Sequence, residues 1–132
     1  MTVADYLPIF LPGDVATLTA SAAITGGQLL AVSGSGTIAP AAAGSANWIG
    51  VAAADTASGG RVPFYPRGVI HETLADGSIT AADQLQTGAT GKVKALAAAA
   101  ADAASDINAA RAVIGVALTT AADGVAARWM AW

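Results

Sequence analysis

The 132-residue chain has no cysteine, a single histidine, and charged side chains at only 11% of its positions. Without cysteine, neither a disulfide nor a thiolate metal site can hold the fold. Zinc sites usually draw on several histidine or cysteine ligands, so we expect no metal centre and no cofactor. The six basic residues are scattered along a chain of net charge −3. Because nucleic-acid binding needs a basic stripe, no nucleic-acid partner is predicted.

The scarcity of charge also bears on the surface of the protein. Ordinary soluble domains carry roughly 25% charged residues, and a surface with few charges is hard to keep soluble as a free monomer. The composition therefore favours a protein whose surface is partly covered by other protein. The alternative is that alanine, threonine, serine and glycine supply the exposed surface. The length is that of one domain.

No segment of the chain has the pattern of a leader peptide or a membrane span. Residues 1–5 lack the positive charge and the apolar run of a signal peptide. The uncharged stretch between Asp14 and Asp55 is interrupted repeatedly by glycine, serine, threonine and glutamine, unlike a membrane helix. We expect no membrane partner, and synthesis and assembly in the cytosol.

The residues needed for catalysis are also missing. The single histidine, His71, lies between Ile70 and Glu72 in a predicted strand, where we expect it to be exposed. No Gly-x-Ser-x-Gly elbow is present to place a serine beside it. The segment Gly88–Lys92 resembles a phosphate-binding loop, but the required spacing would place glycine at Gln86. The sequence predicts that the protein is not an enzyme, and a small hydrolase would have only His71 to use.

A repeated phrase dominates what is present. The four residues beginning at Ile49 recur 65 residues later, and the match extends to Gly59 with Gly124 and to Phe64 with Trp129. The repeat predicts a duplicated β-unit, at about 24–66 and 80–130, inside one domain spanning 14–132. The repeated residues are Ile49, Gly50, Val51, Ala52 and Ile114, Gly115, Val116, Ala117.

Strand alternation predicts how the repeated phrase packs. Ile49 and Val51 should point to one face of a strand, with Gly50 and Ala52 on the other, and the second copy should do the same. Glycine and alanine on one face either admit a close approach of another backbone or fit a crowded core. Both alternatives make the phrase a scaffold feature and not a chemical motif.

Short β-type runs separated by glycine turns predict an all-β fold, a compact β-sandwich or barrel built from two related units. Pro63 favours an edge position for its strand, because proline cannot donate to the ladder. Residues 97–110 are rich in alanine, and we expect a loop there with at most one short helix. The expected strands are 14–19, 28–32, 37–39, 48–54, 61–65, 69–74, 83–86, 92–96, 112–119 and 125–129.

Both ends of the chain carry apolar residues that predict contacts. Pro8 and Pro12 exclude a helix from residues 1–13, so an extended arm is expected, lying either on its own domain or on a neighbour. The position of Trp129 in the repeat places it in the core, whereas Trp132 is a candidate contact. The candidate contact residues of the arm are Tyr6, Leu7, Ile9 and Phe10.

Several short motifs give the chain a family resemblance. The segment Ile24–Leu29, the paired Ile-Gly-Val-Ala phrases, Arg67–Val69 and the ending 117–124 resemble those of tailed-bacteriophage head-decoration proteins, also called capsid cement or capsid-stabilising proteins. The chain departs from the family pattern at Ala82, where a glycine is expected before the acidic residue.

The resemblance implies a structural virion protein on the outside of an icosahedral capsid. Such a protein would bind the major capsid protein and bridge capsomers as a homotrimer, after assembly in the host cytoplasm. A different function, as a tail or baseplate module that binds carbohydrate, would need an exposed aromatic platform. Only Trp48, Tyr65 and Trp132 are available for one.

Overall fold

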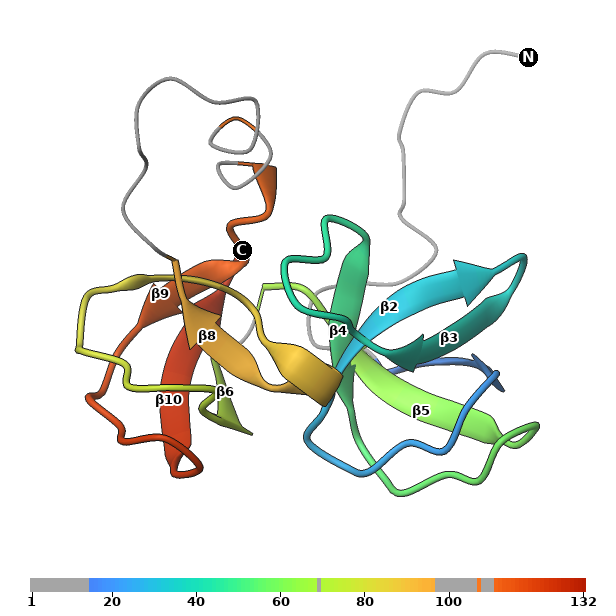
Figure 1. Ribbon diagram of the computed structural model, residues 1–132. Coiled ribbons are helices and arrows are strands. Elements are labelled where there is room, and N and C mark those ends of the chain that lie inside the picture. The colour runs from blue at the N-terminus through green and yellow to red at the C-terminus, as the bar shows by residue number, and fades with distance from the viewer. Residues whose placement is uncertain (1–14, 69, 97–106, 108–110) are drawn as a thin grey trace, which may run out of the picture.

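The computed structural model describes residues 15–68, 70–96, 107 and 111–132 and shows a closed β-barrel beside a second β-sheet (Figure 1). The prediction of a compact all-β fold is confirmed. The only helical element bounded within the described residues is a single 3-10 turn, η1 (Ala89–Gly91). The arm at 1–13 and almost all of the alanine-rich segment 97–110 lie outside the described residues.

The barrel closes in the order β1-β3-β2-β4-β5. Strand β1 runs parallel to β3 and antiparallel to β5, and the other neighbours are antiparallel. Gly36, in the left-handed region at φ 71°, makes the tight turn between β2 and β3. The strands of the barrel are β1 (Ala16–Ala20), β2 (Leu29–Gly34), β3 (Thr37–Pro40), β4 (Trp48–Ala52) and β5 (Arg61–Pro66).

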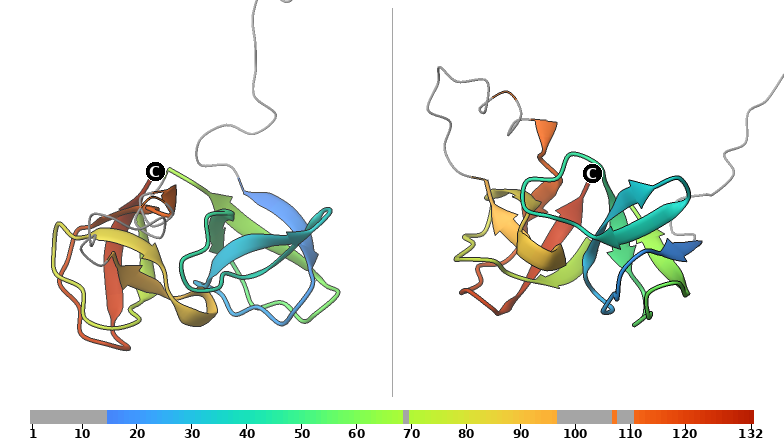
Figure 2. Two further views of the ribbon diagram at one scale, coloured as in Figure 1. Left: turned by 45° about the horizontal axis from the view of Figure 1, so that its top comes forward. Right: turned by 45° about the vertical axis from the view of Figure 1, so that its right-hand side comes forward.

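The second sheet has the order β6-β10-β9-β7-β8, with antiparallel pairing throughout. A parallel bridge between Ala75, just after β6, and Val93 in β8 joins its two edges at one point. The two views in Figure 2 show this sheet beside the barrel. Its strands are β6 (Ile70–Leu74), β7 (Gln84–Thr87), β8 (Val93–Ala95), β9 (Gly115–Ala117) and β10 (Ala126–Ala131).

The two sheets share one strand order. Replacing β1 to β5 by β6 to β10 converts every pairing of the barrel into a pairing of the second sheet, and the bridge to β8 takes the place of the β1–β3 pair. Loop contacts correspond as well. The Gly26 N–H donates to Asp55 Oδ1 (2.8 Å), and the Ala81 N–H donates to Thr120 Oγ1 (3.0 Å). The offsets are 81 − 26 = 55 and 120 − 55 = 65.

These correspondences begin at β1 and β6, before residues 24 and 80, where the predicted β-units begin. We call residues 15–66 the first unit and residues 70–131 the second unit. Residues of the first unit up to Ile38 correspond to residues 55 positions later in the second unit. Residues from Ile49 onward correspond to residues 65 positions later. The ten extra residues of the second unit therefore fall between its β8 and β9, where the alanine-rich segment lies.

Two hydrophobic clusters fill the molecule. One lies inside the barrel and includes Leu30, Ile38 and Phe64. The other fills the second unit around Leu85, Ile114 and Trp129, and continues onto the outer side of β2 and β4 in the barrel. The aromatic residues that end the repeat, Phe64 and Trp129, are 5% and 0% exposed, so the predicted core position of Trp129 is confirmed.

The predicted alternation of the repeated phrase was wrong. Val51 belongs to the cluster shared with the second unit, whereas Ile49 packs against the cluster inside the barrel. The reason is a register shift between β2 and β4: Leu30 pairs with Gly50 and the next pair involves Trp48, which leaves Ile49 as an extra residue. In the second copy, Ile114 is fully buried but Val116 is only half-buried.

The edge position predicted for Pro63 was also wrong. Strand β5 pairs with β1 on one side and β4 on the other. The Pro63 carbonyl accepts a hydrogen bond from the Ala53 N–H (2.9 Å), and Ala53 lies just beyond the end of β4. The side of Pro63 that lacks an N–H thus lies opposite the end of the β4–β5 pairing. The loss of one donor is tolerated there.

Candidate interaction surface

Where the two units meet, an aromatic contact joins them. The outer face of β2 and β4, made of Leu29, Ala31, Trp48 and Val51, is buried against the second unit, and we call it the docking face. The ring of Trp48 lies 5.8 Å from the ring of Trp129. Arg67 also contacts Trp48: its guanidinium lies 4.9 Å over the ring and donates to the Trp48 carbonyl (2.8 Å).

The turn between β7 and β8 completes the junction on the second unit. The Thr87 side chain is fully buried; its hydroxyl donates to the Ala42 carbonyl (2.8 Å) and accepts from the Ser45 N–H (2.7 Å). The Gly91 N–H donates to the Ala41 carbonyl (2.9 Å). These bonds fix the β3–β4 loop of the first unit against the turn, so the junction is specific as well as apolar.

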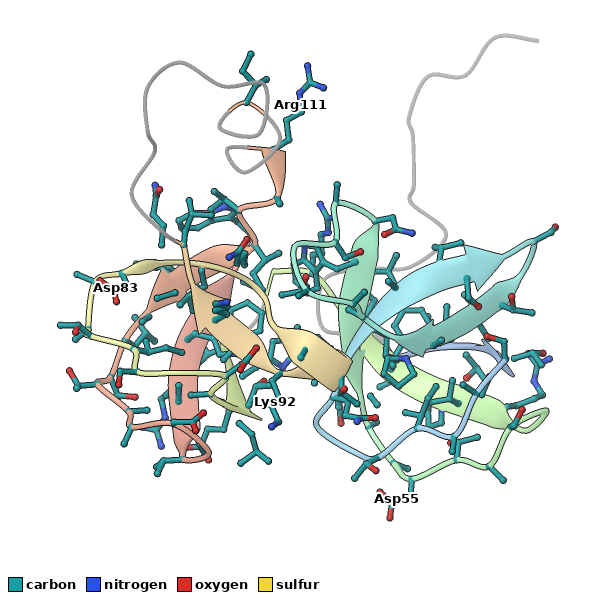
Figure 3. All side chains as sticks on the ribbon, viewed as in Figure 1. Asp55, Asp83, Lys92 and Arg111 are labelled. Carbon is teal, nitrogen blue, oxygen red and sulfur yellow. The ribbon has the colours of Figure 1, made fainter. Side chains whose placement is uncertain are left out.

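A groove of about 610 Å³ runs along the seam between the units. Gln28 crosses it and donates to the Thr90 carbonyl (3.2 Å). Lys92 lies at the seam in Figure 3, whereas Asp55 lies at the end of the barrel and Asp83 on the outer side of the second unit. The residues lining the groove are Thr25, Gly26, Gly27, Gln28, Glu72, Thr73, Leu74, Thr90, Gly91, Lys92 and Ala126.

The glycines of the repeated phrase have the same surroundings in both units. A Cβ on Gly50 would collide with the Tyr65 carbonyl oxygen and come within 3.2 Å of Phe64 Cδ2. A Cβ on Gly115 would collide with the Met130 carbonyl oxygen and come within 2.9 Å of Trp129 Cε3. Of the two alternatives left open by the sequence, the close approach of another backbone is present, and that backbone is the neighbouring strand.

His71 is buried, contrary to the prediction that it is exposed. It is 9% exposed, and its ring lies 5.5 Å from that of Trp129. Its Nε2 has no hydrogen-bond partner within the described part of the chain. Burial lowers the pKa of His71 below 6.5, because the charged imidazolium is poorly solvated there. A strand was predicted at 69–74 and is present as β6, but His71 lies on its inward side.

His71 does not belong to a cluster of metal-ligating side chains within the described residues. In the described residues, no group of three or more His, Cys, Asp or Glu side chains lies close enough to hold a metal ion. The neighbouring Glu72 points outward and pairs with Arg128, Oε1 to Nη2 at 2.6 Å, where both side chains are more than half exposed. The described part of the chain also contains no helix that is long and apolar enough to span a membrane.

Comparison with known proteins identifies the family. The family model described as phage cement protein matches residues 11–130, which is most of the chain. The chain belongs to the phage cement protein family. It is thus a structural protein of the phage virion, associated with the capsid. The resemblance seen in the sequence is confirmed, and its motifs at Ile24–Leu29 and at the paired phrases lie within the matched region.

A solved structure shares the fold of this family member. It is described as the N base of the head fiber gp8.5 in bacteriophage phi29, and it has 23% sequence identity and a TM-score of 0.64. The match covers 90% of this chain and 93% of the phi29 chain. At this identity the likeness concerns the fold. No curated protein matches the sequence.

The predicted contact residues of this family member are only partly described. Trp132 is 51% exposed, and its N–H donates to the Ile114 carbonyl (3.1 Å), which holds the last residue against β9. The arm residues Tyr6, Leu7, Ile9 and Phe10 lie outside the described residues. Trp48 is 2% exposed, so the aromatic platform that carbohydrate binding would need is reduced to Tyr65 and Trp132.

Exposed apolar residues on β5, β6 and β10 and just before β1 could not be recognised from the sequence alone. Val15, Tyr65, Ile70 and Met130 are each between 41% and 59% exposed. The repeat relates these residues in pairs, since 70 − 15 = 55 and 130 − 65 = 65. The relation can be recognised only when the strand register is known. Met130 pairs with Ile70 across β10 and β6.

Proposed function

We propose that this protein is a non-enzymatic stabiliser of a tailed-phage capsid, which binds the outer surface of the shell and bridges neighbouring capsomers as a homotrimer. The major capsid protein would be its partner, and decoration would follow synthesis in the host cytoplasm. The observation that carries the proposal is the way in which the two units pack inside one chain. They dock head to tail: the docking face of the first unit packs against the side of the second unit that carries the β7–β8 turn.

Head-to-tail docking leaves one surface of each kind open in the chain. The second unit has a counterpart of the docking face, and its residues Gln84, Gln86, Val113 and Val116 are half-buried or exposed. The first unit has a counterpart of the receiving turn, where Val32 takes the place of the buried Thr87 and is 44% exposed. A heterologous contact between these two surfaces would link copies into a closed ring if its rotation matches the one inside the chain.

Three chains in such a ring would bring six related units together. A ring on a symmetric shell contacts several capsomers at once, and linked weak contacts then act together through their high effective concentration. The arm residues Tyr6, Leu7, Ile9 and Phe10 would add contacts beyond the ring, either to the shell or to a sister subunit. The low charge of the chain agrees with a surface that is covered in the virion.

The ring contact can be tested on the purified protein. We expect native mass measurement to give a trimer. Val116→Arg or Val32→Arg should reduce it to monomer, because each places an arginine in the proposed contact. Val125→Arg is the matched control, since Val125 is 53% exposed and lies outside both surfaces. A wild-type monomer, or a trimer in both variants, would contradict the proposed contact.

The stabilising role is tested on capsids. Heads lacking the protein should release their contents at lower temperature or pressure than decorated heads, and adding the purified protein back should restore resistance. Unchanged resistance would exclude the role as a stabiliser. Deleting residues 1–13 should weaken decoration while leaving the β-fold intact by circular dichroism, and full occupancy by the deleted form would rule out a contribution of the arm.

A further inference from the structure

We propose that the exposed apolar side chains of Val15, Tyr65, Ile70, Met130 and Trp132 form the surface that docks on the capsid shell. We call these five residues the rung surface. The inference rests on the proposed function, because it assigns the face that would meet the major capsid protein. It is carried by a pattern that recurs in the two units at equivalent places.

The pattern consists of rungs, which are pairs of outward side chains across two antiparallel strands. In the second unit the outward rungs of β6 and β10 are Ile70–Met130, Glu72–Arg128 and Leu74–Ala126. In the first unit Thr17 pairs with Pro63 and Thr19 with Arg61, and extending this register pairs Val15 with Tyr65. Each unit therefore has three outward rungs in corresponding places.

Only one of the three rungs has the same kind of side chain, apolar, in both units. A threonine–proline rung corresponds to a glutamate–arginine rung, and a threonine–arginine rung corresponds to a leucine–alanine rung. The first rung is apolar in both, and its members are 42% (Val15), 41% (Tyr65), 59% (Ile70) and 41% (Met130) exposed. Large apolar side chains that stay exposed at a repeated position indicate a repeated contact.

Inheritance from a common repeat does not account for this pattern. The two units differ at positions with strong structural demands: Leu29 corresponds to Gln84, and Trp48 corresponds to Val113. The side chains of the exposed rung do not contribute to packing within the chain, since they lie outside both hydrophobic clusters. A contact with another molecule explains why both units retain large apolar side chains there.

The shell is the partner that fits this surface. The proposed contacts between sister subunits use the counterpart of the docking face on β7 and β9 and the turn at Val32, whereas the rungs lie on the pairs β1–β5 and β6–β10. Neither apolar rung carries a charge, and the charged rung next to Ile70–Met130, Glu72–Arg128, is an ion pair. A neutral apolar surface is stabilised by burial against protein and needs little complementary charge on its partner. A broad shell surface can provide this burial.

The rungs also join the other predicted contacts. Val15 lies two residues after the arm in sequence, and Met130 is two residues before Trp132, which is itself 51% exposed. If the units are related by rotation about a ring axis, all first rungs in the ring face the same side. Each chain then presents two equivalent contacts to the shell, and a trimer presents six.

The test uses the full chain and capsids of the same phage prepared without this protein. Tyr65→Thr combined with Ile70→Thr removes one large apolar side chain from each rung and puts β-branched threonine, which favours strands, at both positions. Leu118→Thr with Val125→Thr is the matched control, because these side chains are also 42% and 53% exposed but lie off the rungs. Capsid binding by co-sedimentation, native mass and unfolding free energy are measured for each.

We expect the rung variant to bind capsids at least tenfold more weakly, with native mass and unfolding free energy unchanged and the control within twofold of wild type. Wild-type binding by the rung variant would overturn the inference while leaving the proposed function standing. Loss of the oligomer in the rung variant would also overturn it, by assigning the surface to a second copy. Failure of the wild-type protein to bind capsids would reject the proposed function and this inference together.

Discussion

Adding one methyl group at Gly115 should be among the most damaging single changes in this protein. The Cβ of Gly115→Ala would lie far inside contact distance of the Met130 carbonyl oxygen, 3.0 Å from its carbon and 2.9 Å from Trp129 Cε3. Neither obstacle can move away at low cost, because one is backbone and the other belongs to a fully buried ring. Strand β9 would have to separate from β10 by on the order of 1 Å to reach a normal carbon–oxygen distance of about 3.3–3.6 Å.

The expected loss follows from what that separation disrupts. Forcing an atom into a packed core typically costs about 1–3 kcal/mol. The shift would also weaken the three-residue pairing of β9 with β10, and each weakened hydrogen bond adds about 0.5–1.5 kcal/mol. We expect Gly115→Ala to lower the free energy of unfolding by about 3–5 kcal/mol, a large part of the roughly 5–15 kcal/mol of a typical domain.

The assay is urea unfolding followed by tryptophan fluorescence. Gly50→Ala should behave like Gly115→Ala, because its Cβ would meet the Tyr65 carbonyl in the same way. Gly26→Ala is the control: its Cβ would lie 3.4 Å from Ala54, an ordinary contact, and the equivalent residue of the second unit is already Ala81. A loss below about 1 kcal/mol for Gly115→Ala, similar to the control, would refute the close-approach argument.

Further predictions concern the turn, the buried histidine, the junction and the surface ion pair. Ala82 has φ 76° in a turn where the first unit has Gly27, so Ala82→Gly should raise the unfolding free energy by about 0.5–1 kcal/mol in urea titrations; a loss would contradict backbone strain there. Burial lowers the pKa of His71, so the unfolded chain binds the proton more readily. Above pH 6.5 the buried neutral His71 costs no stability. As the pH falls from 6.5 toward the lowered pKa, the free energy of unfolding declines by at most about 1.4 kcal/mol per pH unit. His71→Phe should remove that component from the pH dependence of unfolding, and an identical pH profile would refute it. Trp48→Ala should cost about 3–5 kcal/mol by calorimetry or urea, and less than 1.5 would mean that the junction contributes little. Arg128→Ala should cost less than about 1 kcal/mol, since the pair with Glu72 is exposed; a larger loss would show that the pair is coupled to the sheet.

The limits of prediction from sequence are clearest at particular residues. The chain departs from the family pattern at Ala82, yet the turn forms: the Ala82 N–H donates to the Ala117 carbonyl just as the Gly27 N–H donates to the Ala52 carbonyl. The faces of Ile49 and Val51 could not be predicted, since one extra residue in a strand shifts the alternation. The burial of His71 depends on which side of β6 faces Trp129, and periodicity of two gives no preference between the sides.

The sequence by itself determined the class of the fold, the repeat and the family, because these depend on local patterns: glycine turns, β-type runs, and matching phrases 65 residues apart. The tertiary structure decided how the two units use those patterns. Equivalent strands make a closed barrel in one unit and a sheet joined at one bridge in the other. The outer face of β2 and β4 is buried against the second unit, whereas the corresponding residues of the second unit are half-buried or exposed. Burial of a face depends on what packs against it from distant parts of the chain, and no local pattern contains that information.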